Sequence, residues 1–180
     1  MTFRSHHDPT HIYFVTATVC SWQPLFAEPT YARIVLDSLA WLRRRQRMAL
    51  FAFVLMPSHL HALVKPEDRT IGELLRTFGS FTAHRILRQL REDSCQELLA
   101  LFCQQRRDSR HGHSLWQDIQ AKNIHSVGFL RQKLEYIHNN PLQKQDRTSM
   151  ARADYPYTSA LFYDRGLSAI IPLDDIREWL

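Results

Sequence analysis

Residues 49–65, ALFAFVLMPSHLHALVK, constrain the fold of this chain more than any other segment. The first eight of them form a continuous apolar run, which is the pattern of a strand buried on both faces. The run is far too short to span a bilayer. The Pro-Ser pair then turns the chain, and HLHALVK follows as a second strand. The segment therefore predicts a β-hairpin whose first strand is fully buried.

The hairpin is flanked by segments that follow strand and helix patterns. Strands are predicted at 11–19 and 115–124, and helices from Pro29 to the arginines at 43–47, from the Thr70–Glu73 capping box to about Glu92, around 98–102, and from Ser126 to Pro141. A polar loop is predicted at 104–114 and a short terminal helix at 173–180. The order β-α-β-β-α-β-α predicts an α+β fold. Its first six elements match a ferredoxin-like βαββαβ antiparallel sheet, with helices on one face and the other face open for function.

The overall composition indicates one folded domain of ordinary size. With 180 residues, 44% of them hydrophobic, the chain is expected to form a single domain over 1–180, with its core at 11–140 and a tail at 141–180. Three widely spaced cysteines and a polar N-terminus argue against a disulfide framework and a signal peptide, so a cytoplasmic location is expected. The net charge of +5, with arginine clusters at 43–47 and 106–110, slightly favours a polyanionic partner.

Two histidines in the second strand of the hairpin form the first candidate site. His59 and His61 are separated by one residue, so they share one face of the strand, about 6.6–7 Å apart. Leu60, Ala62 and Val64 occupy the opposite face, where they are expected to pack against helices. Two such imidazoles can bind one divalent metal if a third ligand comes from elsewhere. The alternative is a pair of partly exposed histidines on a solvated sheet face.

The last predicted helix contains the second candidate site. Its apolar stripe is expected to be buried and consists of Val127, Leu130, Leu134 and Ile137. Tyr136 lies to one side of this stripe and meets Asn140 one turn later. The plain alternatives are a tyrosine that flanks the core and an asparagine that caps the helix end before Pro141.

Together with the histidine pair, these residues form a chemically coherent set. Asn140 would supply the third ligand, an oxygen, to a metal that holds a phosphodiester, and Tyr136 would attack phosphorus in line. A phenolate is also a good leaving group, so a phosphotyrosine ester would store the bond energy for rejoining. Lys133 and Arg131 on the same helix would hold the phosphate backbone.

Four segments in this order, LMPSHLHALV, FGSFTAHRI, LWQ and LEYIHNNPLQ, resemble the single-tyrosine HUH transposases, and among them the REP-associated tyrosine transposases. The resemblance covers the chain from about His11 to Tyr157. It implies a ferredoxin-like domain that uses one Mg²⁺ or Mn²⁺ ion to cleave and rejoin single-stranded DNA through a 5′-phosphotyrosine. The DNA would be the hairpins of repetitive extragenic palindromes with a short single-stranded flank. His59 and His61 correspond to the family's metal ligands, Tyr136 to its nucleophile and Asn140 to its amide ligand.

The chain departs from the family pattern at three places: Ser58 stands where an asparagine is common, LQKQD follows NNP, and the region at 95–113 is idiosyncratic. On the second long helix, His84, Arg88 and Arg91 form a row at i, i+4 and i+7 with Arg85 beside it, and this surface is predicted to contact hairpin DNA. The alternative is a solvated helix face. The resemblance further implies a monomer in the cytoplasm, associated with the nucleoid. Two other functions stay open, namely a non-catalytic hairpin-binding protein on the same scaffold and a metallohydrolase of small phosphate esters.

Overall fold

The structure is a computed structural model that describes residues 11–105, 114–143, 151–177 and 180. Four strands and five α-helices follow one another along the described chain. They are β1 (Tyr13–Val19), α1 (Pro29–Arg44), β2 (Met48–Met56), β3 (His59–Pro66), α2 (Ile71–Glu92), α3 (Gln96–Gln104), β4 (Trp116–Asn123), α4 (Val127–Asn139) and α5 (Ala160–Arg165). Single 3-10 turns lie at Cys20–Trp22, Leu25–Ala27, Asn140–Leu142 and Arg152–Asp154. No described helix is long and apolar enough to cross a membrane.

The starts of the long helices are set by local sequence. At α2, the Thr70 hydroxyl accepts from the Glu73 amide at 3.1 Å, and the Glu73 carboxylate accepts from the Thr70 amide at 3.0 Å, which confirms the predicted capping box. At α4, the Ser126 hydroxyl accepts from the Phe129 amide at 3.2 Å. Residues 106–113, with most of the predicted loop and the second arginine cluster, lie outside the described residues.

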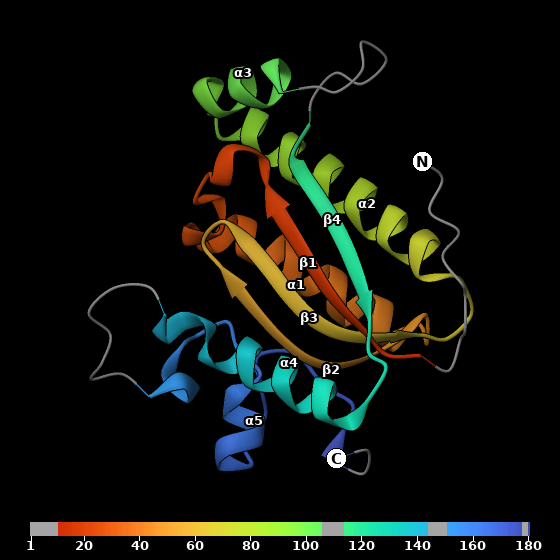
Figure 1. Cartoon of the computed structure of the whole chain (residues 1–180). Coiled ribbons are helices and arrows are strands. Elements are labelled where there is room, and N and C mark those ends of the chain that lie inside the picture. The colour runs from red at the N-terminus through yellow and green to blue at the C-terminus, as the bar shows by residue number, and fades with distance from the viewer. Residues whose placement is uncertain (1–10, 106–113, 144–150, 178–179) are drawn as a thin grey trace.

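The strands form one antiparallel sheet in the order β2-β3-β1-β4 (Figure 1). β3 pairs with β2 on one side and with β1 on the other, and β1 pairs in turn with β4. In this register Thr16 lies opposite His61 in β3 and opposite Gln120 in β4. The predicted α+β fold with a four-stranded antiparallel sheet is confirmed.

One face of the sheet is covered by α1 and α2. Leu60, Ala62 and Val64 belong to the apolar core on this face, as the alternation along the strand predicts. α2 comes close to the edge strand β4 at Gly79, where an added Cβ atom would lie 2.6 Å from Cδ1 of Ile119. A glycine at this position therefore allows the helix to lie against the strand.

The other face is covered in part by α4. Its residues Leu130, Leu134 and Ile137 pack with Leu63 of β3 in a second core. Val127 does not belong to this buried stripe, because it is the first residue of the helix and is 49% exposed. In Figure 1, α4 and α5 lie together on one side of the sheet, away from α2. This face is therefore closed over β2 and β3, which are buried along most of their length, and open at β4.

The C-terminal segment runs along the outer edge of β2. The Tyr157 carbonyl of this segment accepts a hydrogen bond from the Leu55 amide of β2 (2.9 Å). The Ser159 amide donates one to the Phe53 carbonyl of β2 (2.9 Å). These bonds occupy polar backbone groups that an edge strand otherwise leaves unpaired. The segment continues into α5, a helix that the sequence pattern does not predict.

The predicted helix at 173–180 is not formed by residues 173–176, and residues 178–179 lie outside the described residues. Asp174 provides the reason. Its carboxylate accepts from the Arg43 guanidinium at 2.8 Å and from the Leu50 amide at 2.9 Å, and its own amide donates to the Leu50 carbonyl at 2.8 Å. These bonds hold the segment extended against the end of α1 and the start of β2.

Candidate active site

His59 and His61 lie side by side on the α4 face of β3, with their ring centroids 4.9 Å apart. Their exposed fractions are only 4% and 5%. The interpretation as partly exposed histidines on a solvated face is therefore wrong. Buried polar side chains need partners, and each ring has a hydroxyl beside it. Thr16 Oγ1 lies 3.0 Å from Nδ1 of His61, and Ser58 Oγ lies 3.2 Å from Nδ1 of His59.

These hydrogen bonds suit metal binding. A histidine that binds a metal through one ring nitrogen commonly has the other nitrogen held by a hydrogen bond. Here a hydroxyl lies at each Nδ1, so Nε2 is the atom that would bind the metal. Among the described residues, no group of three or more His, Cys, Asp or Glu side chains could hold a metal ion. A site built on His59 and His61 therefore needs oxygen donors from an amide, a phosphate or water, and such a mixed set fits a divalent cation.

Asn140 is the candidate for the amide oxygen. It ends α4, one turn beyond Tyr136, and is 6% exposed. The next residue is Pro141, which has no amide hydrogen for the α-helical bond, so α4 ends here and the chain continues in the 3-10 turn Asn140–Leu142. The role of Asn140 as a ligand stays a prediction. The neighbouring Asn139 is engaged elsewhere, because its amide group makes 3.3 Å hydrogen bonds to Glu135 and Arg152.

Tyr136 reaches from α4 to the histidine pair. Its hydroxyl oxygen lies 3.4 Å from Nε2 of His61. Its ring stands edge-on to the rings of His61 and Phe14, at centroid distances of 5.1 and 5.8 Å. Phe14 also stacks on His61 at 5.3 Å, so the three rings form a cluster that orients the phenol beside the histidine.

Lys133 points to this cluster, whereas Arg131 does not. Lys133 Nζ lies 5.3 Å from the centroid of the Tyr136 ring and 4.7 Å from that of Phe14. Its charge favours an anion, either a phosphate or a phenolate, at the same place. Arg131 instead donates to the carbonyl of Leu180. The orientation of Arg131 therefore gives no support to its predicted contact with DNA.

The predicted row on α2 is exposed on the opposite side of the sheet. His84, Arg85 and Arg88 all face solvent. The Arg85 guanidinium lies 5.9 Å from the ring centroid of Phe81, and Arg88 is 3.6 Å from Glu92. The structure thus places these basic side chains on a surface of their own and does not bring them together with Tyr136.

Sequence reasoning does not identify the residues that support the site. Phe14 and Thr16 alternate along β1 and face the same side as His61. The alternation is visible in the sequence, but only the register between β1 and β3 shows which side chains they contact. Trp22 likewise gives no sequence signal, although its ring lies 5.3 Å from that of His59.

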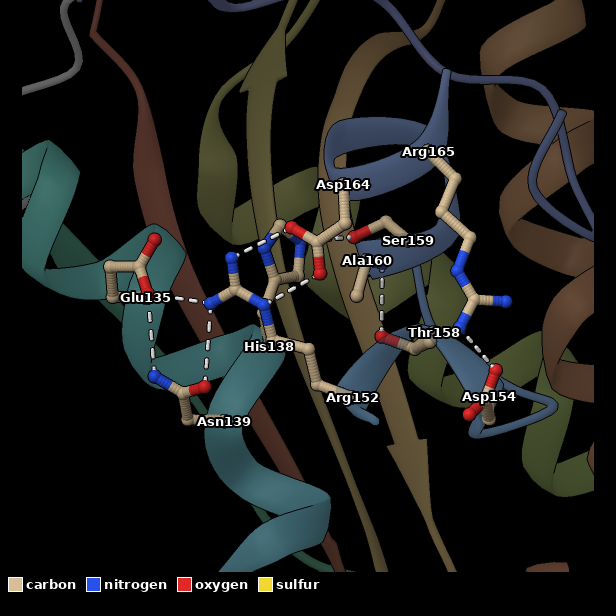
Figure 2. A network of polar contacts seen from close by, with 10 residues as sticks. All are labelled: Glu135, His138, Asn139, Arg152, Asp154, Thr158, Ser159, Ala160, Asp164 and Arg165. Atoms are coloured by element: carbon tan, nitrogen blue, oxygen red, sulfur yellow. Dashed lines mark hydrogen bonds and ion pairs between the residues drawn. The ribbon is translucent and has the colours of Figure 1, made fainter. Parts of the chain in front are cut away.

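A polar network behind α4 fixes the position of this helix (Figure 2). Arg152 donates to Glu135 at 2.6 Å and to Asn139 at 3.3 Å, and it makes two 2.7 Å bonds to Asp164 of α5. The guanidinium keeps the pKa of Asp164 below its usual range. Because Glu135 and Asn139 flank Tyr136 along the helix, the network holds the turn from which the tyrosine projects.

His138 ties the same helix to the sheet from inside. Its Nε2 lies 2.9 Å from the hydroxyl of Ser159, which in turn accepts from the Phe53 amide of β2 at 2.9 Å. Burial, and after it the charge of Arg152, lowers the pKa of His138 to about 4. The ring is therefore neutral at physiological pH and acts as a hydrogen-bonding partner.

The fold of this chain is similar to folds found in solved structures. No protein-family model matches the chain, and no curated protein sequence matches it. A putative transposase from Deinococcus radiodurans R1 aligns with 71% of this chain and 88% of its own, at 18% identity and a TM-score of 0.45. A structure described as the REP-associated tyrosine transposase bound to a REP hairpin aligns with 98% of this chain and 93% of its own, at 16% identity and a TM-score of 0.63. Over nearly its whole length, the chain therefore has the fold of that tyrosine transposase.

Proposed function

We propose that this chain cleaves and rejoins single-stranded DNA next to hairpins, with Tyr136 as the nucleophile. The observation that supports this most is the 3.4 Å distance between the Tyr136 hydroxyl and Nε2 of His61, beside the buried pair of His59 and His61. The strand order, with α1 and α2 on one face, supports a ferredoxin-like sheet. The fold shared with a transposase bound to a REP hairpin supports repetitive extragenic palindromes as the DNA.

In the proposed reaction, each residue has a distinct role. The Tyr136 oxygen bonds to phosphorus and loses its proton, while the bond from phosphorus to the preceding 3′-oxygen breaks and that oxygen gains a proton. His59, His61 and Asn140 would hold one Mg²⁺ or Mn²⁺ ion, which when bound neutralises charge on the phosphate. Lys133 stabilises the phenolate and the phosphate. Attack by a 3′-hydroxyl on the phosphotyrosine reverses the step and rejoins DNA.

The basic surface on α2 and Lys133 on the other side of the sheet suggest how the DNA would lie. We assign the hairpin stem to His84, Arg85 and Arg88 on α2, because exposed arginine and histidine side chains can donate hydrogen bonds to the phosphates along a double helix. The single-stranded flank would pass the open edge at β4 and reach Lys133 on the opposite face. A stem on one face and a scissile strand on the other keeps the cut outside the duplex.

We propose that one chain suffices for cleavage, because Tyr136 reaches His61 of its own chain. Mixing a Tyr136→Phe protein with a His61→Ala protein tests this point. If each tyrosine acts within its own chain, the mixture stays inactive. Restored cleavage would show that the tyrosine works in a partner's site.

The experiment for the main proposal uses an end-labelled hairpin oligonucleotide with a single-stranded flank and Mn²⁺. The wild-type protein should give a covalent adduct on a denaturing gel, together with a fragment that ends in a 3′-hydroxyl. Tyr136→Phe should give neither product and should bind the oligonucleotide as tightly as the wild type. Tyr157→Phe, a matched substitution in the C-terminal segment, should retain both products.

Three outcomes would contradict the proposal. Undiminished cleavage by Tyr136→Phe would show that Tyr136 is not the nucleophile. Tight binding without any adduct from the wild-type protein would favour the non-catalytic hairpin-binding function. Turnover of a small chromogenic phosphate ester that survives the loss of Tyr136 would favour the metallohydrolase.

A further inference from the structure

The turn after β1 has a strained backbone beside the candidate site. Ser21 and Trp22 both have φ of 54°, in the left-handed region that non-glycine residues rarely adopt. Such a conformation is unfavourable and persists only where the surroundings enforce it. The enforcing contacts are backbone bonds from Val19 to Ser58 (3.0 Å) and from Cys20 to Leu115 (2.8 Å), and a bond from the Ser21 amide to the Gln117 side chain (3.2 Å).

The strained turn places the Trp22 indole beside His59. The two ring centroids are 5.3 Å apart and the planes are 71° to one another. His59 is only 4% exposed, whereas Trp22 remains 54% exposed. Burial of the indole therefore does not explain the strain, because more than half of this large apolar side chain stays in solvent. What the turn does achieve is an exposed aromatic surface directly beside the histidine pair.

The site consequently has an aromatic ring at each end. Tyr136 stands at His61 and Trp22 stands at His59, with the two imidazole rings between them. A phosphodiester held at the histidines has a nucleoside on either side of it. One of those nucleosides would lie next to the exposed indole. Stacking on an aromatic side chain is the usual way in which single-stranded DNA is held, because every base has a π-face.

We propose that Trp22 is the stacking platform for the nucleobase adjacent to the scissile phosphate. This inference rests on the proposed function, since it takes single-stranded DNA as the ligand of the histidine pair. Trp22 acts here as a positioning residue. Stacking fixes the nucleotide next to the phosphate and thereby aligns phosphorus with the Tyr136 oxygen.

The stacking role is tested by measuring DNA binding in proteins that also carry Tyr136→Phe, so that no cleavage occurs during the measurement. The probe is the hairpin oligonucleotide with the fluorescent base 2-aminopurine placed in turn at each position of the flank. One position should be quenched on binding, and Trp22→Ala should abolish that quenching and weaken binding between about 5- and 150-fold. Trp22→Phe should retain most of the quenching and most of the binding affinity. Trp41→Ala removes a comparably exposed tryptophan from α1, on the opposite face, and should leave the quenching unchanged.

An abasic nucleotide at the quenched position completes the test. It should weaken binding by the Trp22-containing protein and have no further effect on Trp22→Ala, because both changes remove the same contact. Equal quenching in Trp22→Ala, or an abasic penalty that is the same in both proteins, would overturn the stacking role. If either result is found while the wild-type protein still forms the covalent adduct with DNA, only the stacking role of Trp22 is overturned and the proposed cleavage function stands. A wild-type protein that binds no hairpin oligonucleotide would overturn both.

Discussion

The two faces of the sheet are built from different kinds of side chain. On the α1 and α2 face the core is mainly apolar, with Leu60 of β3 among its fully buried members, and the buried hydroxyls of Ser38 and Thr82 bond to carbonyls of their own helices. On the α4 face several polar residues are buried as well, among them His59, His61, His138 and Asn140. Buried polar groups are costly without partners, so this face also needs the hydroxyls and the C-terminal network that surround them. One face therefore stabilises the fold mainly by apolar packing, while the other positions chemical groups.

The sharpest test of this division is the removal of a histidine from the α4 face. His61→Ala should lower the rate of cleavage by at least about 100-fold, since even residues that only support a metal ligand contribute about 10- to 100-fold. Arg33→Ala removes an exposed cation from α1 and should change the rate less than about twofold. Cleavage is measured on the labelled hairpin at saturating protein. Comparable losses of cleavage rate in the two variants would show that the two faces do not differ in function.

A smaller effect is expected from the network that holds α4. Arg152→Ala leaves Glu135 and Asp164 without their shared partner and should lower the free energy of unfolding by about 1–2 kcal/mol, because the group is only partly buried. Amide exchange of α4 should accelerate more than that of α2. Arg165→Ala breaks an exposed pair with Asp154 and should cost less than about 0.5 kcal/mol. Equal urea midpoints for the two variants would show that the network does not stabilise α4.

The α2 surface should affect DNA affinity without affecting the chemical step. Arg88→Ala should weaken hairpin binding several-fold and reduce the slope of log affinity against log salt by about 1, as expected for one lost phosphate contact. The rate of cleavage of bound DNA should be unchanged. Binding is measured by fluorescence anisotropy over a series of salt concentrations. An unaltered slope would remove Arg88 from the proposed stem-binding surface.

The smallest expected effect concerns the contact of α2 with β4. Gly79→Ala adds a Cβ atom 2.6 Å from Cδ1 of Ile119, which must move to another position. That movement costs about 0.5–1.5 kcal/mol, and the gain in helix propensity of about 1 kcal/mol offsets it. The midpoint of thermal unfolding should therefore change by only a few degrees. A large loss of stability would show that the Ile119 side chain cannot move aside and that α2 and β4 are packed rigidly at this point.

Local patterns in the sequence predict much of this fold because they depend on neighbouring residues. The capping box at Thr70 fixes the start of α2, and the alternation through His59 and His61 puts both rings on one face. Val127 shows the limit of periodicity. It has the spacing of the buried stripe, but it begins the helix and lies outside the second core.

Features that depend on distant parts of the chain are not predictable in this way. Arg152 meets Asp164, Glu135 and Asn139 only because the C-terminal segment returns to β2 and α4. The placement of Trp22 depends on backbone bonds to Ser58 and Leu115 and on left-handed backbone angles without a glycine. Such contacts require the strand register and the path of the tail, neither of which a local pattern encodes.

The order of elements along the chain has a consequence for how the protein is made. Chains are synthesised from the N-terminus, and early segments can begin to fold before later ones appear. The four strands and α4, with most of the apolar core that α4 shares with the sheet, precede residue 151, while Arg152, Ser159 and Asp164, which add the polar contacts to α4 and α5, follow it. A nascent or truncated chain ending before residue 151 would therefore keep the packing of α4 on the sheet but lack the polar contacts that fix the turn carrying Tyr136. The complete set of contacts around α4 becomes possible only after residues 152–164 have been synthesised.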